Sequence, residues 1–371
     1  MGLLSIVVFR FSAAFGTAQQ LSARSLTVLF NNDKLSDSSD AFWRLFVRDW
    51  SFSMKVILTG SIAIDYLMKF PGLFKDHLLP EHLDKVSLSF LVPELSRRDG
   101  GVGANIAYNL AMLGGKACLF STAGKDFPDY AKRLEAVGVD TSSVRIIEDK
   151  YTASFFATTD RNNAQIASFY TGAMANAAEL SLEDAPYEQD DFVMISPTDP
   201  AAMSLYVEEA MELGLKMLFD PGQQVISVDA DLLRCGLETA HGLFVNEYEF
   251  ELIQKHTGFS AQELLEKPVF SVVTLGENGA RVYADGIDII VPALKGLTIV
   301  DPTGVGDAFR GGFLRGYLAG LSLKTCAEMG TITAAACIQQ DGTQIHRLSW
   351  DDFVREYRKH FDDQGELDKI G

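Results

Sequence analysis

Cysteine is scarce in this sequence, and the few cysteines are not paired. Cys118, Cys235, Cys326 and Cys337 lie far apart, and no CxxC pair occurs in the 371 residues. A zinc site or a redox-active dithiol of the usual spacing is therefore not expected, and isolated thiols are typical of a reducing compartment. None of the six histidines belongs to an HExxH motif, which excludes that zinc-peptidase pattern.

Positive charge and long apolar runs are also lacking. The chain has 32 Lys and Arg against 50 Asp and Glu, a formal net charge of −18. An acidic surface repels phosphate backbones, so we expect no nucleic-acid partner. No apolar run approaches the roughly 20 residues that span a bilayer, so no membrane partner is expected. The Walker A pattern GxxxxGK[ST] is missing as well, which argues against a P-loop protein.

Residues 1–53 differ from the rest of the chain. The first 30 contain Arg10, Arg24, several serines and no acidic residue, a composition that an organelle-targeting segment can have. A strand-like run begins directly after Met54. We therefore interpret residues 1–53 as a disordered extension or a mis-started upstream stretch, and residues 54–371 as the domain. A cytoplasmic location is expected, with organelle import as the alternative.

Strand-like and helix-like segments alternate from Met54 onward. Strands are predicted at 55–59, 117–121, 192–196, 216–219, 242–245, 269–274 and 280–284, and helices at 103–113, 130–137, 201–213, 247–255, 308–319 and 323–339. Such alternation predicts an α/β fold with a mainly parallel sheet covered by helices on both faces. Two stretches, 86–95 and 152–170, look like strands without helices between them. The second contains the polar turn 160–163, which indicates a hairpin, and we expect these strands to form a small sheet that covers a site as a lid.

The segment Asp-Pro-Thr-Gly-Val-Gly-Asp-Ala-Phe at 301–309 is the strongest candidate site. Gly304 and Gly306 allow backbone amides to turn toward one point, and the following helix adds its positive end. Together they predict a hole for a phosphate, with Asp307 beside it to take the proton of an attacking hydroxyl. The alternative is an ordinary Asp N-cap after a glycine turn.

A second glycine-rich segment, Gly-Gly-Val-Gly-Ala-Asn at 100–105, also opens a predicted helix. As a dinucleotide loop it is a weak match, because no confident strand directly precedes it. Its backbone equally suits close approach to a polyhydroxylated ligand, with Asn105 bonding hydroxyls.

Together, these motifs resemble those of the PfkB family of carbohydrate and nucleoside kinases, the group of ribokinase and adenosine kinase. Residues 60–65 resemble the family's first strand and its Asp, residues 100–105 its first signature, residues 246–249 its NxxE motif and residues 301–309 its second signature. They occur in the family's order, and the likeness extends over 54–361. It implies a ribokinase-like three-layer α/β/α sandwich, with lid strands from about 65–98 and 151–172.

The resemblance also implies roles for matching positions. Asp307 is the expected base, and the amides of Gly304, Val305 and Gly306 form the anion hole. Asp65, Gly101, Gly103 and Asn105 are expected at the substrate. Gln165 and Phe169 lie where a lid strand could bring them to a base or sugar; the alternative is that they are ordinary lid-strand side chains. Thr274, Gly276, Gly279 and Gly342 are expected at ATP, and Asn246 and Glu249 at Mg²⁺, largely through water.

The resemblance implies ATP-dependent phosphorylation of the primary hydroxyl of a nucleoside, with adenosine as first choice. Residues 170–174 and 220–223 favour the nucleoside kinases of archaea and bacteria. A ribokinase- or fructokinase-type sugar kinase is one alternative, and a non-catalytic ligand-binding regulator on a kinase scaffold is another. Pro302 and Val305 replace the family's common Thr and Ala, and neither change removes an amide that the hole needs. Either a monomer or a lid-mediated homodimer is expected.

Overall fold

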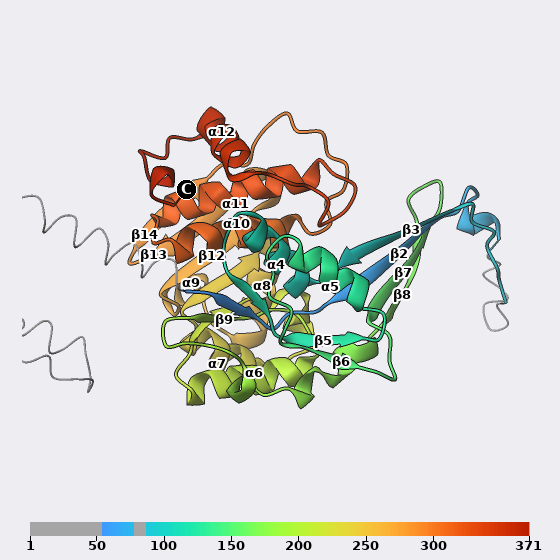
Figure 1. Cartoon of the computed structure of the whole chain (residues 1–371), viewed down its shortest axis with the longest axis horizontal. Coiled ribbons are helices and arrows are strands. Elements are labelled where there is room, and N and C mark those ends of the chain that lie inside the picture. The colour runs from blue at the N-terminus through green and yellow to red at the C-terminus, as the bar shows by residue number, and fades with distance from the viewer. Residues whose placement is uncertain (1–53, 78–86, 371) are drawn as a thin grey trace, which may run out of the picture. The chain divides into compact units, whose positions relative to one another are not determined.

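A computed structural model describes residues 54–77 and 87–370 (Figure 1). The interpretation of residues 1–53 lies outside the described residues. The main sheet has the strand order β14-β13-β12-β11-β10-β9-β1-β4. Its strands are β1 (Val56–Leu58), β4 (Ala117–Leu119), β9 (Phe192–Ile195), β10 (Lys216–Phe219), β11 (Gly242–Asn246), β12 (Phe270–Thr274), β13 (Ala280–Ala284) and β14 (Ile287–Val291). The six strands from β4 to β12 run parallel, and β13 and β14 are antiparallel.

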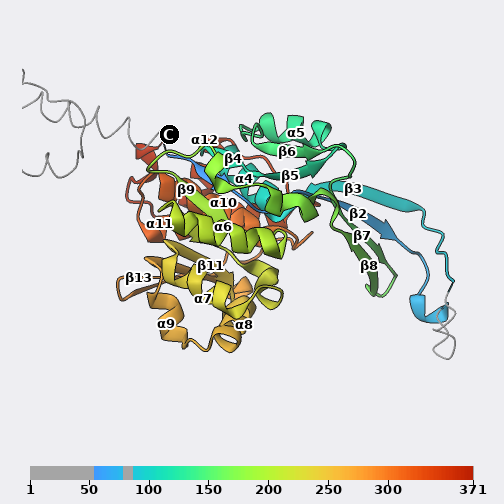
Figure 2. The ribbon, with the colours of Figure 1, turned by 90° about the horizontal axis from the view of Figure 1, so that it is seen from below.

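Helices cover both faces of this sheet, as Figures 1 and 2 show. One layer contains α4 (Val102–Met112), α5 (Pro128–Glu135), α10 (Val305–Leu318), α11 (Leu323–Ile338) and α12 (Trp350–His360). The opposite layer contains α6 (Pro200–Glu212), α7 (Ala230–Thr239), α8 (Glu247–Thr257) and α9 (Ala261–Glu266). The predicted α/β class with covered faces is therefore confirmed.

The central strands are apolar at every position because both of their faces are buried. In β1, Val56 and Leu58 belong to the core under α10, whereas Ile57 belongs to the core under α6. Residues alternate between the faces of a strand, so a strand with two covered faces needs a continuous apolar run.

A second, four-stranded sheet with the order β3-β2-β7-β8 projects from the main body (Figure 1). Its strands are β2 (Ala63–Lys69), β3 (Glu94–Gly100), β7 (Ala153–Thr159) and β8 (Gln165–Tyr170), and a pair of short strands, β5 (Ser121–Gly124) and β6 (Val144–Ile147), lies at its base. The predicted hairpin is confirmed, since Thr159 pairs with Gln165 around the turn. The strand predicted at 86–95 is wrong in position: β3 runs from Glu94 to Gly100 because those residues pair with β2, and residues 87–93 form no strand.

Gly60 and Gly103 bring the end of β1 against the first turn of α4. A Cβ on Gly103 would lie 2.6 Å from the carbonyl oxygen of Gly60, and a Cβ on Gly60 would lie 2.7 Å from the nitrogen of Gly103. Both contacts are with backbone atoms, which cannot rotate away. The Asn105 side chain, two residues further along α4, depends on this approach for its position.

We therefore expect Gly103→Ala to lower the free energy of unfolding by about 1–3 kcal/mol through overpacking. Gly214→Ala is a control, because a Cβ there meets nothing within 4 Å and only the left-handed backbone (φ +66°) is strained; its cost is on the order of 1 kcal/mol. Urea denaturation of both variants measures the difference. An equal loss in both would contradict the close-approach argument.

Candidate active site

Polar residues follow three neighbouring parallel strands of the main sheet. Asp220 comes directly after β10, Asn246 ends β11 and Thr274 ends β12, and Asn246 pairs in register with Thr274. Carboxyl ends of parallel strands meet at one edge, where ligands bind in open α/β sheets. The predicted metal residues and one predicted ATP residue therefore share this edge.

The turn at the start of α10 contains Gly304, Val305 and Gly306, the residues predicted to form an anion hole. Gly304 adopts φ +71° as the residue that precedes the helix, and α10 begins at Val305. The amides of Val305, Gly306 and Asp307 lie in the first turn, where N–H groups have no acceptor within the helix. A Cβ on Gly304 would lie 2.6 Å from the Thr343 methyl, so glycine is required both for the backbone angle and for the space. These donors and the helix dipole favour an anion at this point.

Asp307 is the third residue of α10, not its N-cap, so the alternative of an ordinary Asp cap is wrong. Its Oδ2 accepts a hydrogen bond of 2.8 Å from Nδ2 of Asn105, which lies 202 residues earlier in the sequence. Desolvation by burial raises the pKa of Asp307 to about 6, against the opposing effects of Arg310 and Asn105. A carboxyl group with this pKa is ionised at neutral pH and is more basic than an exposed aspartate, as a proton acceptor should be.

A buried arginine, Arg310, lies one turn after Asp307. Its Nη2 donates to Oδ1 of Asp220 over 2.7 Å, and both side chains are less than one-tenth exposed. A Cβ on Gly306 would lie 3.0 Å from Nη1 of Arg310, so the guanidinium sits directly behind the predicted anion hole. Asp220, Asp307 and Glu249 together raise the pKa of Arg310 despite its desolvation. The positive charge of Arg310 therefore interacts favourably with the negative charges of all three carboxylates.

The NxxE motif forms a capping box at the start of α8. Oδ1 of Asn246 accepts from the Glu249 amide, and Oε2 of Glu249 accepts from the Asn246 amide, both over 2.8 Å. This spacing satisfies two orphan helix amides at once. Burial, followed by the nearby charge of Asp220, raises the pKa of Glu249. One oxygen of the Glu249 carboxylate is occupied by the cap, and the other is left for a ligand.

The resemblance implies that Glu249 orders the waters of Mg²⁺. On that hypothesis, Glu249→Ala should raise the Mg²⁺ concentration for half-maximal activity by about tenfold, the usual size of a second-shell loss. Glu263→Ala is a matched control, since Glu263 forms the same capping box with Ser260 at the start of α9. Both variants lose the glutamate half of the capping box and keep the N-cap residue, Asn246 or Ser260. A titration of initial rate with Mg²⁺ separates them, and equal behaviour of the two variants would refute a metal role for Glu249.

Asn105 connects the substrate side of the site to the base. Besides bonding Asp307, its Oδ1 accepts from Nε2 of Gln344 over 2.8 Å, and the same Gln344 nitrogen lies 2.5 Å from the Tyr130 hydroxyl. Tyr130 in turn donates to the carbonyl of Gly100. Gly101, at φ +95°, precedes α4, and Gly103 lies in its first turn. The network therefore holds Asn105 against Asp307, and Gly101 and Gly103 lie at the start of the same helix.

Asp65 lies on lid strand β2, in register with Arg98 on β3 and Phe155 on β7. Phe155 pairs with Phe169 on β8, so Asp65 and Phe169 share one face of the lid sheet, with Gln165 further out on the same face. Burial raises the pKa of Asp65 to about 6, while Arg98 opposes the rise. Gln165 is exposed and bonds Thr159. The lid face toward Asp65 therefore combines a carboxylate with aromatic side chains.

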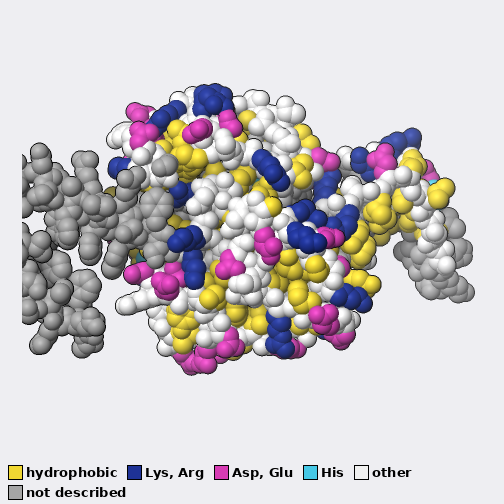
Figure 3. Space-filling model, in the orientation of Figure 1, with side chains coloured by type: hydrophobic (Ala, Val, Ile, Leu, Met, Phe, Trp, Pro, Cys, Tyr) yellow, Lys and Arg dark blue, Asp and Glu magenta, His cyan; other side chains and the backbone are white. Residues whose placement is uncertain are grey.

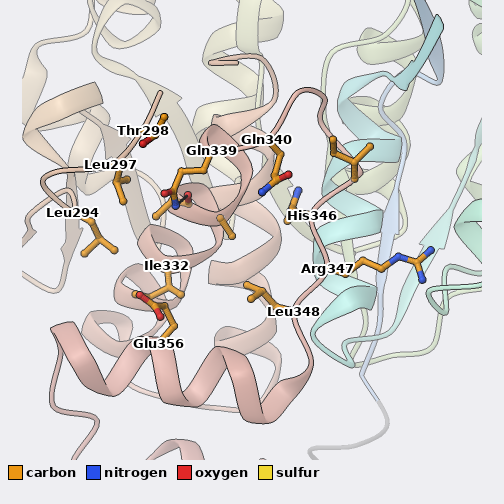
Figure 4. Close-up of a pocket in the computed structure, with 13 residues that line it drawn as sticks. Leu294, Leu297, Thr298, Ile332, Gln339, Gln340, His346, Arg347, Leu348 and Glu356 are labelled. Carbon is orange, nitrogen blue, oxygen red and sulfur yellow. Dashed lines mark hydrogen bonds between the residues drawn. The ribbon is translucent and has the colours of Figure 1, made fainter. Parts of the chain in front are cut away.

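A cavity of about 510 Å³ lies between α11, the segment before the anion hole and the segment after α11 (Figure 4). Its lining includes Leu297, Thr298, Ala336, Gln340 and Ile345. Gly342 falls within this last segment but does not line the cavity. Thr274, Gly276 and Gly279 lie at the β12–β13 turn, outside the lining residues, so their predicted role at ATP stays a prediction.

Three residues of this site were missed in the sequence: Arg310, Arg98 and Gln344. The sequence did contain a sign of Arg310's role. An arginine next to Phe309, Gly311 and Gly312 in a helix predicted to be buried needs an acidic partner. Residues 220–223 were noticed, but the pairing of Asp220 with Arg310 joins positions 90 residues apart. No local pattern indicates the contacts of Gln344.

The three-layer fold, the lid and a carboxylate at the start of a glycine-led helix define a phosphotransferase that acts on a hydroxyl group. The pattern of the pfkB family of carbohydrate kinases matches residues 59–350. The chain therefore belongs to the pfkB family, and the resemblance found in its motifs is confirmed.

Two relatives that are 30% or more identical to this chain are nucleoside kinases. The nucleoside kinase of Methanocaldococcus jannaschii is 30% identical over 308 residues, which cover 82% of this chain and 97% of that protein. The ligand-free nucleoside kinase of Burkholderia thailandensis superposes with a TM-score of 0.74 at 34% identity, covering 81% of this chain and 99% of that one. A ribokinase from Thermotoga maritima, at 20% identity and a TM-score of 0.69, shares the fold.

Proposed function

We propose that this protein transfers the γ-phosphoryl group of ATP to the 5′-hydroxyl of a nucleoside, with adenosine as first choice. The observation that carries the proposal is the pairing of Asp307 with Asn105 beside the free amides at the start of α10. The Burkholderia nucleoside kinase, which is 34% identical, has been solved in complex with inosine and with ADP and inosine. Those complexes support a purine nucleoside and ATP for this chain.

The chain's residues account for each part of the reaction. Asp65 accepts hydrogen bonds from two ribose hydroxyls, since one carboxylate can accept both. Asp307 takes the proton of the 5′-hydroxyl as its oxygen bonds to the γ-phosphorus, and the bond from that phosphorus to the β–γ bridging oxygen breaks, releasing ADP. The amides of Val305 and Gly306, with Arg310 behind them, stabilise the charge on the transferring group. Phe155 and Phe169 supply flat surfaces on which a base can stack.

The donor set suits Mg²⁺ held through water. Among the described residues no cluster of three or more His, Cys, Asp or Glu side chains could ligate a metal directly. Oδ2 of Asp220 has no hydrogen-bond partner within the described part of the chain, and Glu249 keeps one oxygen free of its cap. Mg²⁺ retains several waters and arrives with nucleotide phosphates, so Asn246 and Glu249 would hold its waters. The ion would neutralise charge on the phosphates.

The adenine of ATP is assigned to the cavity beside α11, with Gly342 in the loop at its edge. Its apolar side chains, Leu297, Ala336 and Ile345, offer faces for a base, and Gln340 offers polar atoms. Its volume of about 510 Å³ lies within the usual range of ligand pockets. Thr274, Gly276 and Gly279 remain proposed contacts on the phosphate side.

A substrate panel tests the proposal. ADP release would be measured with adenosine, inosine, cytidine, ribose and fructose at equal concentration. We expect the purine nucleosides to be preferred, and 5′-phosphorylation to be found in the product. Turnover of ribose or fructose with no nucleoside turnover would establish the sugar-kinase alternative. Binding without any ADP release would favour the regulator alternative, against which the intact Asp307 and glycine turn argue.

Activity is expected to depend on two protons in mildly acidic solution. Asp65 and Asp307 both have a pKa raised by burial to about 6, and both act in the ionised form. Protonation below pH 6 therefore removes substrate binding and the base together, so log kcat/KM should fall with a slope of about two. In Asp65→Asn the residual activity should fall with a slope of about one. A wild-type profile that stays flat down to pH 5 would contradict both roles.

We propose a homodimer formed through the lid, with a monomer as the alternative. The lid face opposite Asp65 carries Leu95, Phe156, Ile166 and Tyr170, each at least 40% exposed. Hydrophobic side chains are visible along the lid in Figure 3, and exposed apolar patches of this kind mark interaction surfaces. Light scattering of the wild type and of Ile166→Lys tests the assembly. A wild type that is monomeric at micromolar concentration would refute it.

A cytoplasmic location is proposed as well. All four cysteines lie within the described residues and are free thiols, which suits a reducing compartment. In the described ranges, 54–77 and 87–370, no helix is long and apolar enough to cross a bilayer.

A further inference from the structure

One lid arginine, Arg98, joins three segments of the site. It lies on β3, and its side chain is only 19% exposed. Nη1 donates to Oδ2 of Asp301 over 2.7 Å, and Nη2 donates to Oδ1 of Asp341 over 2.5 Å. Asp301 begins the turn that forms the anion hole, and Asp341 lies in the loop next to the α11 cavity. The two bonds therefore tie the lid to the segments expected to hold the nucleotide.

The strand register places the same arginine beside the substrate carboxylate. Arg98 is the direct partner of Asp65 in the β2–β3 pair, so the two side chains share a face of the lid. The neighbouring Arg97 points to the opposite face and pairs with Asp99. Arg98 is thus the guanidinium of this strand that faces the site.

Contacts of the Thr343 side chain reinforce this junction. Oγ1 of Thr343 donates to the carbonyl of Asp99 over 3.0 Å, and the Thr343 methyl packs on Gly304. The end of β3, the 341–343 loop and the anion-hole turn are therefore in mutual contact. A displacement of β3 moves Asp65 and strains the bonds to Asp301 and Asp341 at the same time.

We propose that Arg98 is a positioning residue that holds the lid against the anion-hole turn, so that a hydroxyl bound at Asp65 and a phosphoryl group bound at Gly304 are aligned. The planar fork of arginine bonds two carboxylates in fixed directions, which the single ammonium of lysine cannot reproduce. Binding of the nucleoside and binding of ATP are then coupled, because each stabilises the same placement of the lid. The inference rests on the proposed nucleoside kinase function.

The test compares Arg98→Met with Arg97→Met, its neighbour on the other lid face. Calorimetry would measure the affinity for a non-hydrolysable ATP analogue with and without adenosine, and steady-state kinetics would give kcat and both KM values. In the wild type and in Arg97→Met, adenosine should tighten analogue binding by about 5-fold or more. In Arg98→Met this factor should approach one, and kcat should fall about tenfold or more through misalignment. Arg98→Lys should lie between them.

A second variant separates a loss of coupling from a loss of stability. Asp341 is 68% exposed, so Asp341→Asn should keep the wild-type melting temperature and still lose part of the coupling. The proposal is overturned if the wild type shows no coupling, or if Arg98→Met and Asp341→Asn both match Arg97→Met. A wild type that phosphorylates a sugar but no nucleoside would instead refute the proposed function, and the same coupling would then be measured with that sugar.

Discussion

Asp307→Asn is expected to lower kcat about 10³-fold, within the range for loss of a general base. The amide has nearly the shape of the carboxylate, and its oxygen can still accept the hydrogen bond from Asn105. Substrate and ATP affinities should therefore change little, because only proton acceptance is lost. Steady-state kinetics with adenosine measures the effect. A variant with wild-type kcat would show that Asp307 is not the base.

The same substitution should stabilise the protein at neutral pH. The pKa of Asp307 in the folded protein is about 6, above the ordinary value of 3.8. A raised carboxyl pKa means that ionisation opposes folding, so the cost is present above about pH 6 and absent below about pH 4. Solvent screening of the partly exposed group keeps the expected gain on the order of 1 kcal/mol. Urea unfolding at pH 8 and at pH 3.5 measures this gain in stability. A gain of equal size at both pH values would show that it does not come from removing the ionised carboxylate.

Arg310→Met is expected to destabilise the protein by about 3–5 kcal/mol at pH 8, because it leaves a buried charge without its partner. Asp220 is only 1% exposed and keeps one oxygen unbonded within the described residues. Removing the cation also raises the pKa of Asp220 and Asp307 further, since Arg310 lowers both in the wild type. The destabilisation should therefore shrink as the pH falls and these carboxylates become protonated.

Arg315→Met is the matched control for that experiment. Arg315 lies on the same helix and is equally buried, but among the residues that the structure describes it bonds the carbonyls of Leu113 and Ile370 and no carboxylate. Its loss should cost stability by an amount that does not change between pH 5 and pH 8. Arg310→Met with Asp220→Asn should recover much of the stability lost in the single variant. If the loss of stability changed with pH in the same way in Arg310→Met and Arg315→Met, Arg310 would not act by compensating the charges of the buried carboxylates.

The capping box at α8 shows how one motif can have two roles. Asn246 and Glu249 were predicted as metal residues from their resemblance to the NxxE motif, and the same spacing is that of a helix cap. The structure contains the cap, while their common edge with Asp220 and Thr274 leaves the metal role as a proposal. Because the cap holds both side chains at the strand ends, the two roles are compatible.

The chain's local patterns were sufficient to predict the parallel sheet, the lid hairpin and a glycine turn before a helix at 304–305. Strand and helix periods depend on near neighbours, and residues 301–307 carry the whole turn in one contiguous segment. The start of β3 was misplaced, because pairing with β2 decides where that strand begins.

The charge arrangement around the anion hole was decided by the tertiary structure alone. Asn105 meets Asp307 across 202 residues, Arg98 meets Asp301 across 203 and Arg310 meets Asp220 across 90. Each pair joins segments that become neighbours only when the strands align and the lid sheet forms. A local sequence pattern carries no information about the distance between such segments. These contacts therefore follow from the packing of the folded chain.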